Sequence, residues 1–193
     1  MTCMLSRRSV LTGGLAVFAG LASGGRPARA TIVRPVTLPE LVGMSRHRIV
    51  GTPLSASARW ETIGGSERIV TYHTLRVDYA LDGTAPTAGD LVVRTLGGAV
   101  GDIGQIVPGE APLRKGETAA LFLEDVKTNV FAVSAMAQGH YRIFADEQGA
   151  KRVRANSFTL RGATSEAAVV RLDGRTVVDV ESLVYQEVLR GGR

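Results

Sequence analysis

The chain has 193 residues, with 23 Lys and Arg against 18 Asp and Glu, a formal net charge of +5, and one cysteine. The first 30 residues hold four arginines, no acid and the cysteine, so the remaining 163 residues carry 19 basic and 18 acidic groups. That near-neutral, cysteine-free part excludes a disulfide framework and a thiolate metal site, and its charge gives no argument for binding nucleic acid or anionic lipid. It is long enough to bury one core of ordinary size.

The first 30 residues have the three parts of a signal peptide. Arg7 and Arg8 precede an apolar stretch from Val10 to Ala22, and Ala28 and Ala30 supply the small residues of a cleavage site. The twin arginines resemble a Tat export signal, with a Sec signal and incidental arginines as the alternative. We predict cleavage after Ala30, the Tat translocase as a partner during export, and a final location in the periplasm or outside the cell. No stretch reaches the roughly 20 apolar residues of a membrane span.

Two segments have the spacing of a helix start. Thr37 and Glu40 are spaced as a capping box, which predicts a short helix from about Leu38 to Ser45. Thr176 and Asp179 repeat that spacing before an apolar face, which predicts a C-terminal helix at about 177–190.

The segment between these helices has the pattern of β-strands. The longest candidate, Arg68 to Leu81, would span roughly 45 Å, so we expect it to bend or coil as strands do in small closed barrels. The run Thr118–Leu123 is nearly continuously apolar, which predicts burial on both faces. The other expected strands are 48–60, 91–96, a short one at 103–107, 130–138, 140–144 and 151–154. The sum is a mainly β single domain over 31–193, with a helix at each end.

Three segments carry a resemblance to known proteins: 41–51 (LVGMSRHRIVG), 92–109 (VVRTLGGAVGDIGQIVPG) continuing to Leu123, and 136–141 (MAQGHY). They resemble a family of uncharacterised exported bacterial proteins. The order of parts over 38–145 also resembles netrin-like domains, and this resemblance implies an OB-type closed barrel.

The netrin-like resemblance also bears on mechanism. Netrin-like tissue inhibitors of metalloproteinases chelate the protease metal through an N-terminal cysteine, which disulfides hold in place. The expected mature chain begins at Thr31 and has no cysteine, so it cannot act by that chelation. What the resemblance implies is an exported barrel that binds another exported protein, for which a protease is a candidate.

A glycine-rich segment follows the predicted strand 91–96. Gly98, Gly101 and Gly104 have the spacing of a phosphate-binding loop. A dinucleotide site needs a helix to start at such glycines, but Pro108 and Pro112 follow them here. We therefore interpret the segment as a surface loop shaped by turns and bulges.

The three histidines have no spacing typical of a zinc site. His47 lies between two arginines, and His73 shares a strand face with Leu75, which favours a packed histidine. A site that joins His47, His73 and His140 in space stays open, but we assign no metal and no cofactor.

The sequence contains no strong catalytic motif. The expected mature chain has no cysteine nucleophile and no Gly-x-Ser-x-Gly elbow. Glu110 with Glu117, or Asp102 with Glu110, could meet as a glycosidase-type acid pair, although solvated loop acids are the common outcome. We therefore assign no catalytic residue and favour a non-enzymatic role.

A basic and aromatic stretch calls for a check against nucleic-acid binding, because OB barrels often bind oligonucleotides. Arg142, Lys151, Arg152 and Arg154 lie near Tyr141, Phe144 and Phe158 in the sequence. This is a local patch in a near-neutral, exported chain, so we expect no nucleic-acid partner.

Trp60 is the only tryptophan, and it lies beside the turn 61–65. The sequence favours a core role for it and leaves a contact role open. For protein binding, the expected contact residues are Arg59 and Trp60, with Asp102 and Gln105 from the glycine-rich segment, because binding hot spots favour Trp and Arg.

These observations together predict an exported, non-catalytic protein-binding module, acting with or on an exported protein such as a protease. The alternatives are an exported hydrolase or metal-binding enzyme with a site in the glycine-rich loops, and a structural protein of the cell envelope.

Overall fold

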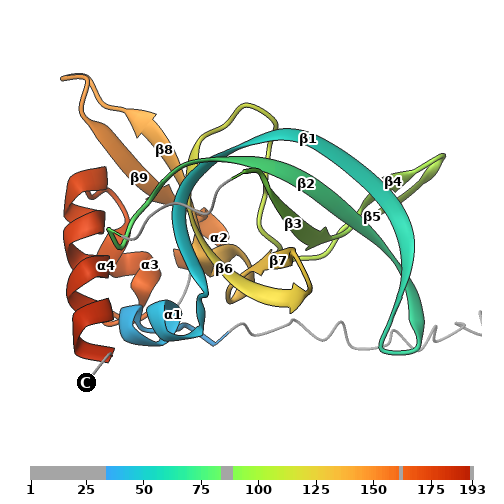
Figure 1. Cartoon of the computed structure of the whole chain (residues 1–193), viewed down its shortest axis with the longest axis horizontal. Coiled ribbons are helices and arrows are strands. Elements are labelled where there is room, and N and C mark those ends of the chain that lie inside the picture. The colour runs from blue at the N-terminus through green and yellow to red at the C-terminus, as the bar shows by residue number, and fades with distance from the viewer. Residues whose placement is uncertain (1–33, 84–88, 161–162, 192–193) are drawn as a thin grey trace, which may run out of the picture. The chain divides into compact units, whose positions relative to one another are not determined.

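The computed structural model describes residues 34–83, 89–160 and 163–191 (Figure 1), which belong to one structural unit over 32–193. The predicted export signal with Arg7 and Arg8, and the predicted cleavage site at Ala28 and Ala30, lie outside the described residues. None of the helices in the described ranges has the length and apolar character that crossing a membrane requires.

The described part of the chain is mainly β with short helices, which confirms the predicted class. The strands are β1 (His47–Ile63), β2 (Ser66–Ala80), β3 (Leu91–Leu96), β4 (Gly98–Val100), β5 (Ile103–Gln105), β6 (Ala119–Lys127), β7 (Val130–Val133), β8 (His140–Ala145) and β9 (Lys151–Ala155). The helices are α1 (Leu38–Met44), α2 (Ser157–Leu160), α3 (Ala168–Leu172) and α4 (Val177–Gly191), with a 3-10 turn at Met136–Gly139.

Seven strands form one sheet in the order β1-β2-β3-β7-β6-β8-β9, and β6 pairs in addition with β1. The pairings therefore run from β1 through β2, β3, β7 and β6 back to β1. All are antiparallel except β3 with β7, which is parallel. β4 and β5 form a separate two-stranded hairpin.

β1 and β2 form a long ribbon that bends, as the length of the second strand predicts (Figure 1). Gly64 and Gly65, both with positive φ, make the two-residue turn that joins them. The pairing register shifts between Val50 and Gly51 and again between Pro53 and Ser55. Such shifts are β-bulges, which kink a strand and increase its twist.

The buried apolar side chains form two clusters on opposite faces of β1 and β6. Val50 and Phe122 belong to the cluster that α1, α3 and α4 cover. Ile49 and Leu121 belong to the other, with residues of β2, β3 and β7 and the segment 111–113. Neighbouring residues of β6 thus enter different clusters, which confirms the predicted burial on both faces.

The helix starts follow the predicted capping. Thr37 N–H donates to Glu40 Oε2 at 2.8 Å, and Thr37 Oγ1 accepts from Glu40 N–H at 3.4 Å. Thr176 and Asp179 make the reciprocal pair of bonds before α4. Both expected helices are confirmed, because each cap satisfies backbone N–H groups that the first turn leaves without partners.

The predicted strand 130–138 is wrong beyond Val133. Ala135 and Met136 have φ of +51° and +58°, a left-handed backbone that no strand contains. The 3-10 turn that follows leads into β8. A Cβ on Gly139 would collide with the carbonyl oxygen of Ser134, so only glycine fits there.

Candidate functional site

The glycine-rich segment lies at the end of the β1–β2 ribbon that is remote from the helices (Figure 1). Its hairpin, β4 with β5, crosses the ribbon closely at Gly98. A Cβ on Gly98 would lie 3.3 Å from the Ala58 Cβ and would collide with Thr71 Oγ1. Glycine at this position therefore permits the hairpin to rest directly on β1 and β2.

Hydrogen bonds fix the segment on both sides of its exposed part. Gln105 Oε1 accepts the backbone N–H of Ile69 at 2.8 Å. The carboxylate of Glu110 accepts the N–H groups of Leu96 and Ala111, each at 3.1 Å. The loop between Gln105 and Glu110 is thus tied to the ends of β2 and β3, and we expect it to keep one conformation.

A pocket of about 510 Å³ opens between the ribbon and this segment. Thr71, His73 and Thr95 line it together with 96–99, 104–107 and 110–113. His73 Nε2 lies 3.1 Å from Thr95 Oγ1, whereas its Nδ1 is buried with no hydrogen-bond partner among the described residues. Burial lowers the pKa of His73 and raises the pKa of Glu110. Burial therefore favours the neutral forms of both groups.

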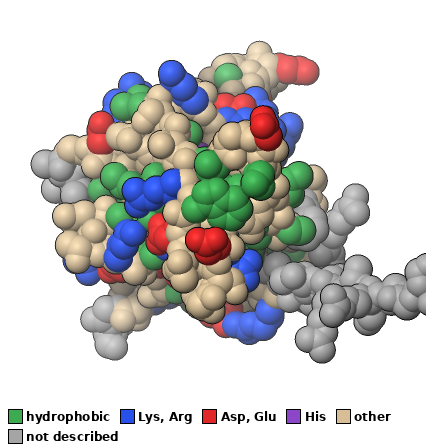
Figure 2. All heavy atoms as spheres, turned by 90° about the vertical axis from the view of Figure 1, so that its right-hand side faces the viewer, with side chains coloured by type: hydrophobic (Ala, Val, Ile, Leu, Met, Phe, Trp, Pro, Cys, Tyr) green, Lys and Arg blue, Asp and Glu red, His purple; other side chains and the backbone are tan. Residues whose placement is uncertain are grey.

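Three large apolar side chains of the ribbon and the glycine-rich segment are exposed: Trp60 at 43%, Ile103 at 56% and Ile106, which lines the pocket, at 92% of their surface. Trp60 pairs with Ile69, the residue that Gln105 holds, so the tryptophan lies beside the hairpin. Figure 2 views this end of the molecule and shows hydrophobic side chains gathered at its centre, with acidic and basic side chains around them. We call Trp60, Ile103, Ile106 and the pocket the apolar end.

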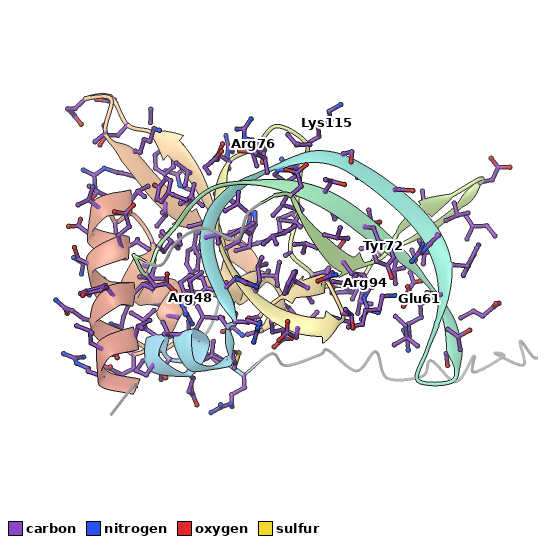
Figure 3. The ribbon with its side chains drawn as sticks, in the orientation of Figure 1. Arg48, Glu61, Tyr72, Arg76, Arg94 and Lys115 are labelled. Carbon is purple, nitrogen blue, oxygen red and sulfur yellow. The ribbon has the colours of Figure 1, made fainter. Side chains whose placement is uncertain are left out.

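The opposite face of the ribbon carries a charged cluster around Tyr72. The Arg59 guanidinium carbon lies 4.1 Å from the Tyr72 ring centroid. The Tyr72 hydroxyl donates to Glu61, and Arg94 pairs with the same carboxylate at 3.0 Å (Figure 3). The Tyr72 hydrogen bond, aided by Lys127 and Arg94, lowers the pKa of Glu61. These charged groups therefore have partners within the chain.

The predicted contact residues fall on different parts of this end. Trp60 belongs to neither buried cluster, so the core role that the sequence favours is wrong. Arg59 is its neighbour on β1 and points to the opposite face, toward Tyr72. Gln105 anchors the backbone, and Asp102 lies in the exposed turn between β4 and β5.

The residues that sequence reasoning missed are Ile103 and Ile106. Their signal in the sequence is two isoleucines inside a glycine-rich segment. Such a segment cannot bury them by itself, because its turns hold its side chains at the surface.

The histidines do not come together as a metal site. Across the described ranges, no group of three His, Cys, Asp or Glu side chains is placed to hold a metal ion. His47 packs edge-on against Phe131 with ring centroids 4.7 Å apart. His140 is buried in β8, and burial lowers its pKa to about 4.

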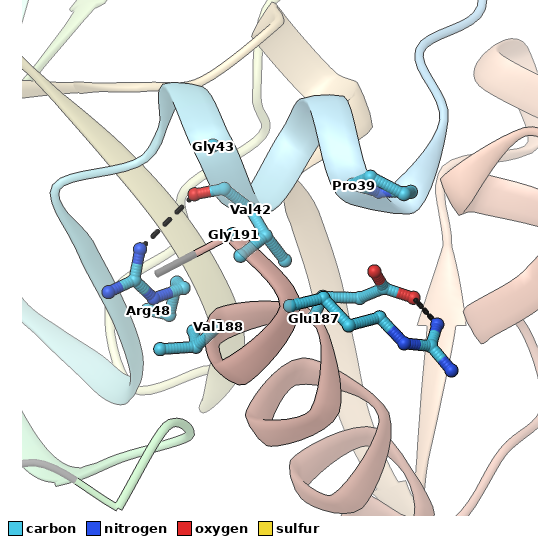
Figure 4. Close-up of a pocket in the computed structure, with 8 residues that line it drawn as sticks. Pro39, Val42, Gly43, Arg48, Glu187, Val188 and Gly191 are labelled. Atoms are coloured by element: carbon cyan, nitrogen blue, oxygen red, sulfur yellow. Dashed lines mark hydrogen bonds and ion pairs between the residues drawn. The ribbon is translucent and has the colours of Figure 1, made fainter. Parts of the chain in front are cut away.

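A second pocket, of about 410 Å³, lies between α1 and α4 (Figure 4). Arg48 lines it, but its guanidinium donates to the carbonyls of Val42 and Ser45 at the end of α1 and pairs with Asp82 at 2.7 Å. Glu187 is paired with Arg190 at 3.0 Å. Both charges serve the packing of the helices, so the apolar end is the stronger candidate for function.

No protein-family model, curated protein or solved structure matches the chain. Function therefore has to be argued from the residues and their geometry.

Proposed function

We propose that the chain is an exported, non-catalytic protein-binding module whose partner contacts the apolar end. The observation that carries this is Ile106, which is 92% exposed on a loop that Gln105 and Glu110 tie down on either side. Exposed apolar side chains that cluster at one place are typical of interaction sites. A loop already held in one conformation loses little entropy when a partner covers it.

The strand pairings support an OB-type closed barrel as the fold of this module. Their order returns to β1, β1 is long and bent, and β3 with β7 is the parallel pair. These features fit the netrin-like resemblance of the sequence and the five-stranded barrel it implies. In this proposal β8, β9 and the helices are additions outside the ring.

The location and the partner of this module are proposed from the sequence. The twin arginines Arg7 and Arg8 and the small residues Ala28 and Ala30 support Tat export to the periplasm or beyond. The partner is then another exported protein, with a protease as the first candidate. The pocket that Ile106 lines suits an apolar side chain of that partner.

Affinity capture from envelope and secreted fractions tests the proposal, with wild-type chain and variants at the apolar end as bait. We expect Ile106→Asp and Trp60→Ala to reduce the capture of a saturable partner at least about tenfold, because both remove apolar contact. Val178→Asp is the matched control, since Val178 is 68% exposed on α4, away from the apolar end. Equal capture by Ile106→Asp and wild type, or background alone for wild type, would contradict the proposal.

The alternative is an exported hydrolase, and one observation favours it. Glu110 and His73 line the same pocket. Burial raises the pKa of Glu110 and lowers the pKa of His73, so it favours the neutral form of each. Both Glu110 oxygens already accept backbone hydrogen bonds, which favours a structural role. Hydrolysis by the purified chain that Glu110→Gln abolishes, in a variant that still folds, would establish the alternative instead. Stoichiometric metal in protein from the native compartment would equally contradict a non-catalytic module.

A further inference from the structure

Over its second half, β1 has a backbone edge with which no described strand pairs. Its first five residues, His47–Gly51, pair with β6, and the carbonyl of Pro53 accepts the N–H of Gly116 at 2.8 Å. Beyond Pro53, β2 is the only described strand that pairs with β1. As far as the described residues go, the edge opposite β2 is therefore unpaired from residue 54 to residue 63.

The pairing register identifies the backbone groups that face this edge. Ile63 and Ser66 flank the two-residue turn, and in such a hairpin the flanking pair is hydrogen-bonded and the pairs alternate from there. Trp60 and Ile69 then form a non-hydrogen-bonded pair. The N–H and C=O of Ile69 accordingly bond to Gln105 and Gly97, on the side away from β1. By the same alternation, the groups on β1 that face the free edge belong to Ala56, Ala58, Trp60 and Thr62.

Nothing in the sequence of this edge blocks pairing with another strand. Natural proteins protect exposed edges with Lys, Pro, bulges or a covering segment. Residues 54–63 contain no Lys and no Pro, and their only charged side chains are Arg59 and Glu61. The register shifts of β1 lie before Ser55, so the rest pairs regularly with β2.

We infer that two copies of the chain pair antiparallel through this edge, about a two-fold axis at Trp60. In that register Arg59 of one copy lies directly opposite Glu61 of the other, and the symmetry makes this contact twice. Among symmetric registers centred on residues 58 to 62, this is the one that sets Arg59 opposite Glu61. Centring on Arg59 or Glu61 would instead oppose like charges, which destabilises a cross-strand pair.

The geometry of the ribbon fits this dimer. Residues 57–63 of each copy would overlap over about 23 Å and exchange roughly six backbone hydrogen bonds at Ala58, Trp60 and Thr62. Ala58, where the hairpin crosses β1, would face the small side chain of Thr62 in the second copy. Two-fold pairing uses the 57–63 edge of both copies at once, so this contact joins two chains and no more. The dimer uses backbone groups of β1, whereas the partner proposed above contacts side chains of the apolar end, and Trp60 belongs to both.

Charge exchange tests the pairing, with sedimentation equilibrium of the full chain as the measurement. For wild type, we expect the dimer fraction to rise with protein concentration. Arg59→Glu and Glu61→Arg should each raise the dissociation constant at least about tenfold, because each opposes like charges at two positions. An equimolar mixture of the two variants should restore dimers, since both contacts then join opposite charges. Monomeric wild type at every concentration, or dimers that Arg59→Glu leaves unchanged, would overturn the inference.

Two further variants keep the test decisive if Glu61→Arg fails to fold. Thr62→Pro removes an N–H at the free edge without touching the ladder to β2, so it should weaken the dimer at least about tenfold relative to Thr62→Ala. Trp60→Cys, in a chain with Cys3→Ser, should give a disulfide-linked dimer, because Cα atoms of a hydrogen-bonded pair lie about 5.5 Å apart. Val178→Cys on α4 is the control. Absence of the cross-link at 60, or an equal one at 178, would overturn the register.

Discussion

The helical end of the sheet buries the inner apolar faces of α1 and α4 and exposes Val178, Tyr185 and Leu189 on α4, whereas the glycine-rich segment of the apolar end leaves both Ile103 and Ile106 exposed. Leu38 and Leu41 of α1 are fully buried against Val180 and Val184 of α4. Ile106, at the other end, is almost fully exposed. Apolar burial is the main source of folding free energy, so we expect the buried side chains of α1 and α4 to contribute to stability, while the exposed side chains of the apolar end stay available for binding.

The charged groups of the two ends also differ in burial. Arg48 and Asp82 pair beneath α1 with side chains 16% and 4% exposed, and Arg48 also holds two carbonyls at the end of that helix. Breaking such a buried pair typically costs about 3–5 kcal/mol. Arg59, by contrast, lies exposed over Tyr72, where a cation–π contact contributes about 0.5–1 kcal/mol. Arg59 can therefore be exchanged without loss of the fold.

The largest expected effect on stability comes from a core substitution at the helical end. Phe122 is fully buried between β6 and the helices, and its ring meets Tyr141 edge-on with centroids 5.9 Å apart. Phe122→Ala should lower the free energy of unfolding by about 3–5 kcal/mol, because it removes buried surface and leaves a cavity. Urea unfolding measures this. A loss below about 1 kcal/mol would mean that this cluster does not carry the stability.

An effect of intermediate size comes from pH. Burial lowers the pKa of His140 to about 4, against an unfolded value near 6.5. Between these values the unfolded chain binds a proton that the folded chain does not, so stability falls as the pH drops from 6.5 to 4 and is fully present above that window. We expect a loss of about 3 kcal/mol from this histidine, measured by urea unfolding across the window.

His140→Gln is the control for the pH effect, because glutamine does not titrate. The variant should retain a smaller slope, to which His73 and His47 contribute because burial lowers the pKa of each. An unchanged slope in His140→Gln would assign the effect to another group.

Local chemistry made much of the fold predictable. The capping box at Thr37 and Glu40 specifies the start of α1 through its own hydrogen bonds, and the apolar run at 118–123 specifies a strand between two clusters. Both signals lie within a few residues of the element they describe. The left-handed backbone at Ala135 has no such signal, because nothing in alanine favours positive φ. α3 was also missed, since its start at Ala167 has no side-chain cap.

The candidate site was predictable only in part, because exposure depends on which distant segment covers a side chain. The sequence places Trp60 near a turn, but the hairpin crosses β1 at Ala58 and leaves the tryptophan exposed. The isoleucines 103 and 106 look like strand residues, and the predicted strand 103–107 is in fact β5, which ends at Gln105. Ile106 falls just beyond it, next to the Gln105 that Ile69 holds, and its side chain is almost fully exposed.

The smallest expected effect is at the apolar end, where an exposed isoleucine can be compared with a buried one. Ile106→Ala should change the free energy of unfolding by less than about 0.5 kcal/mol, because a side chain that is already in water loses no buried surface. Ile69→Ala, at a fully buried position beneath the hairpin, should lose about 2–5 kcal/mol in the same urea titration. Equal losses would mean that Ile106 packs into the core in solution. The apolar end would then be part of the stable body of the protein, and its partner would have to bind elsewhere.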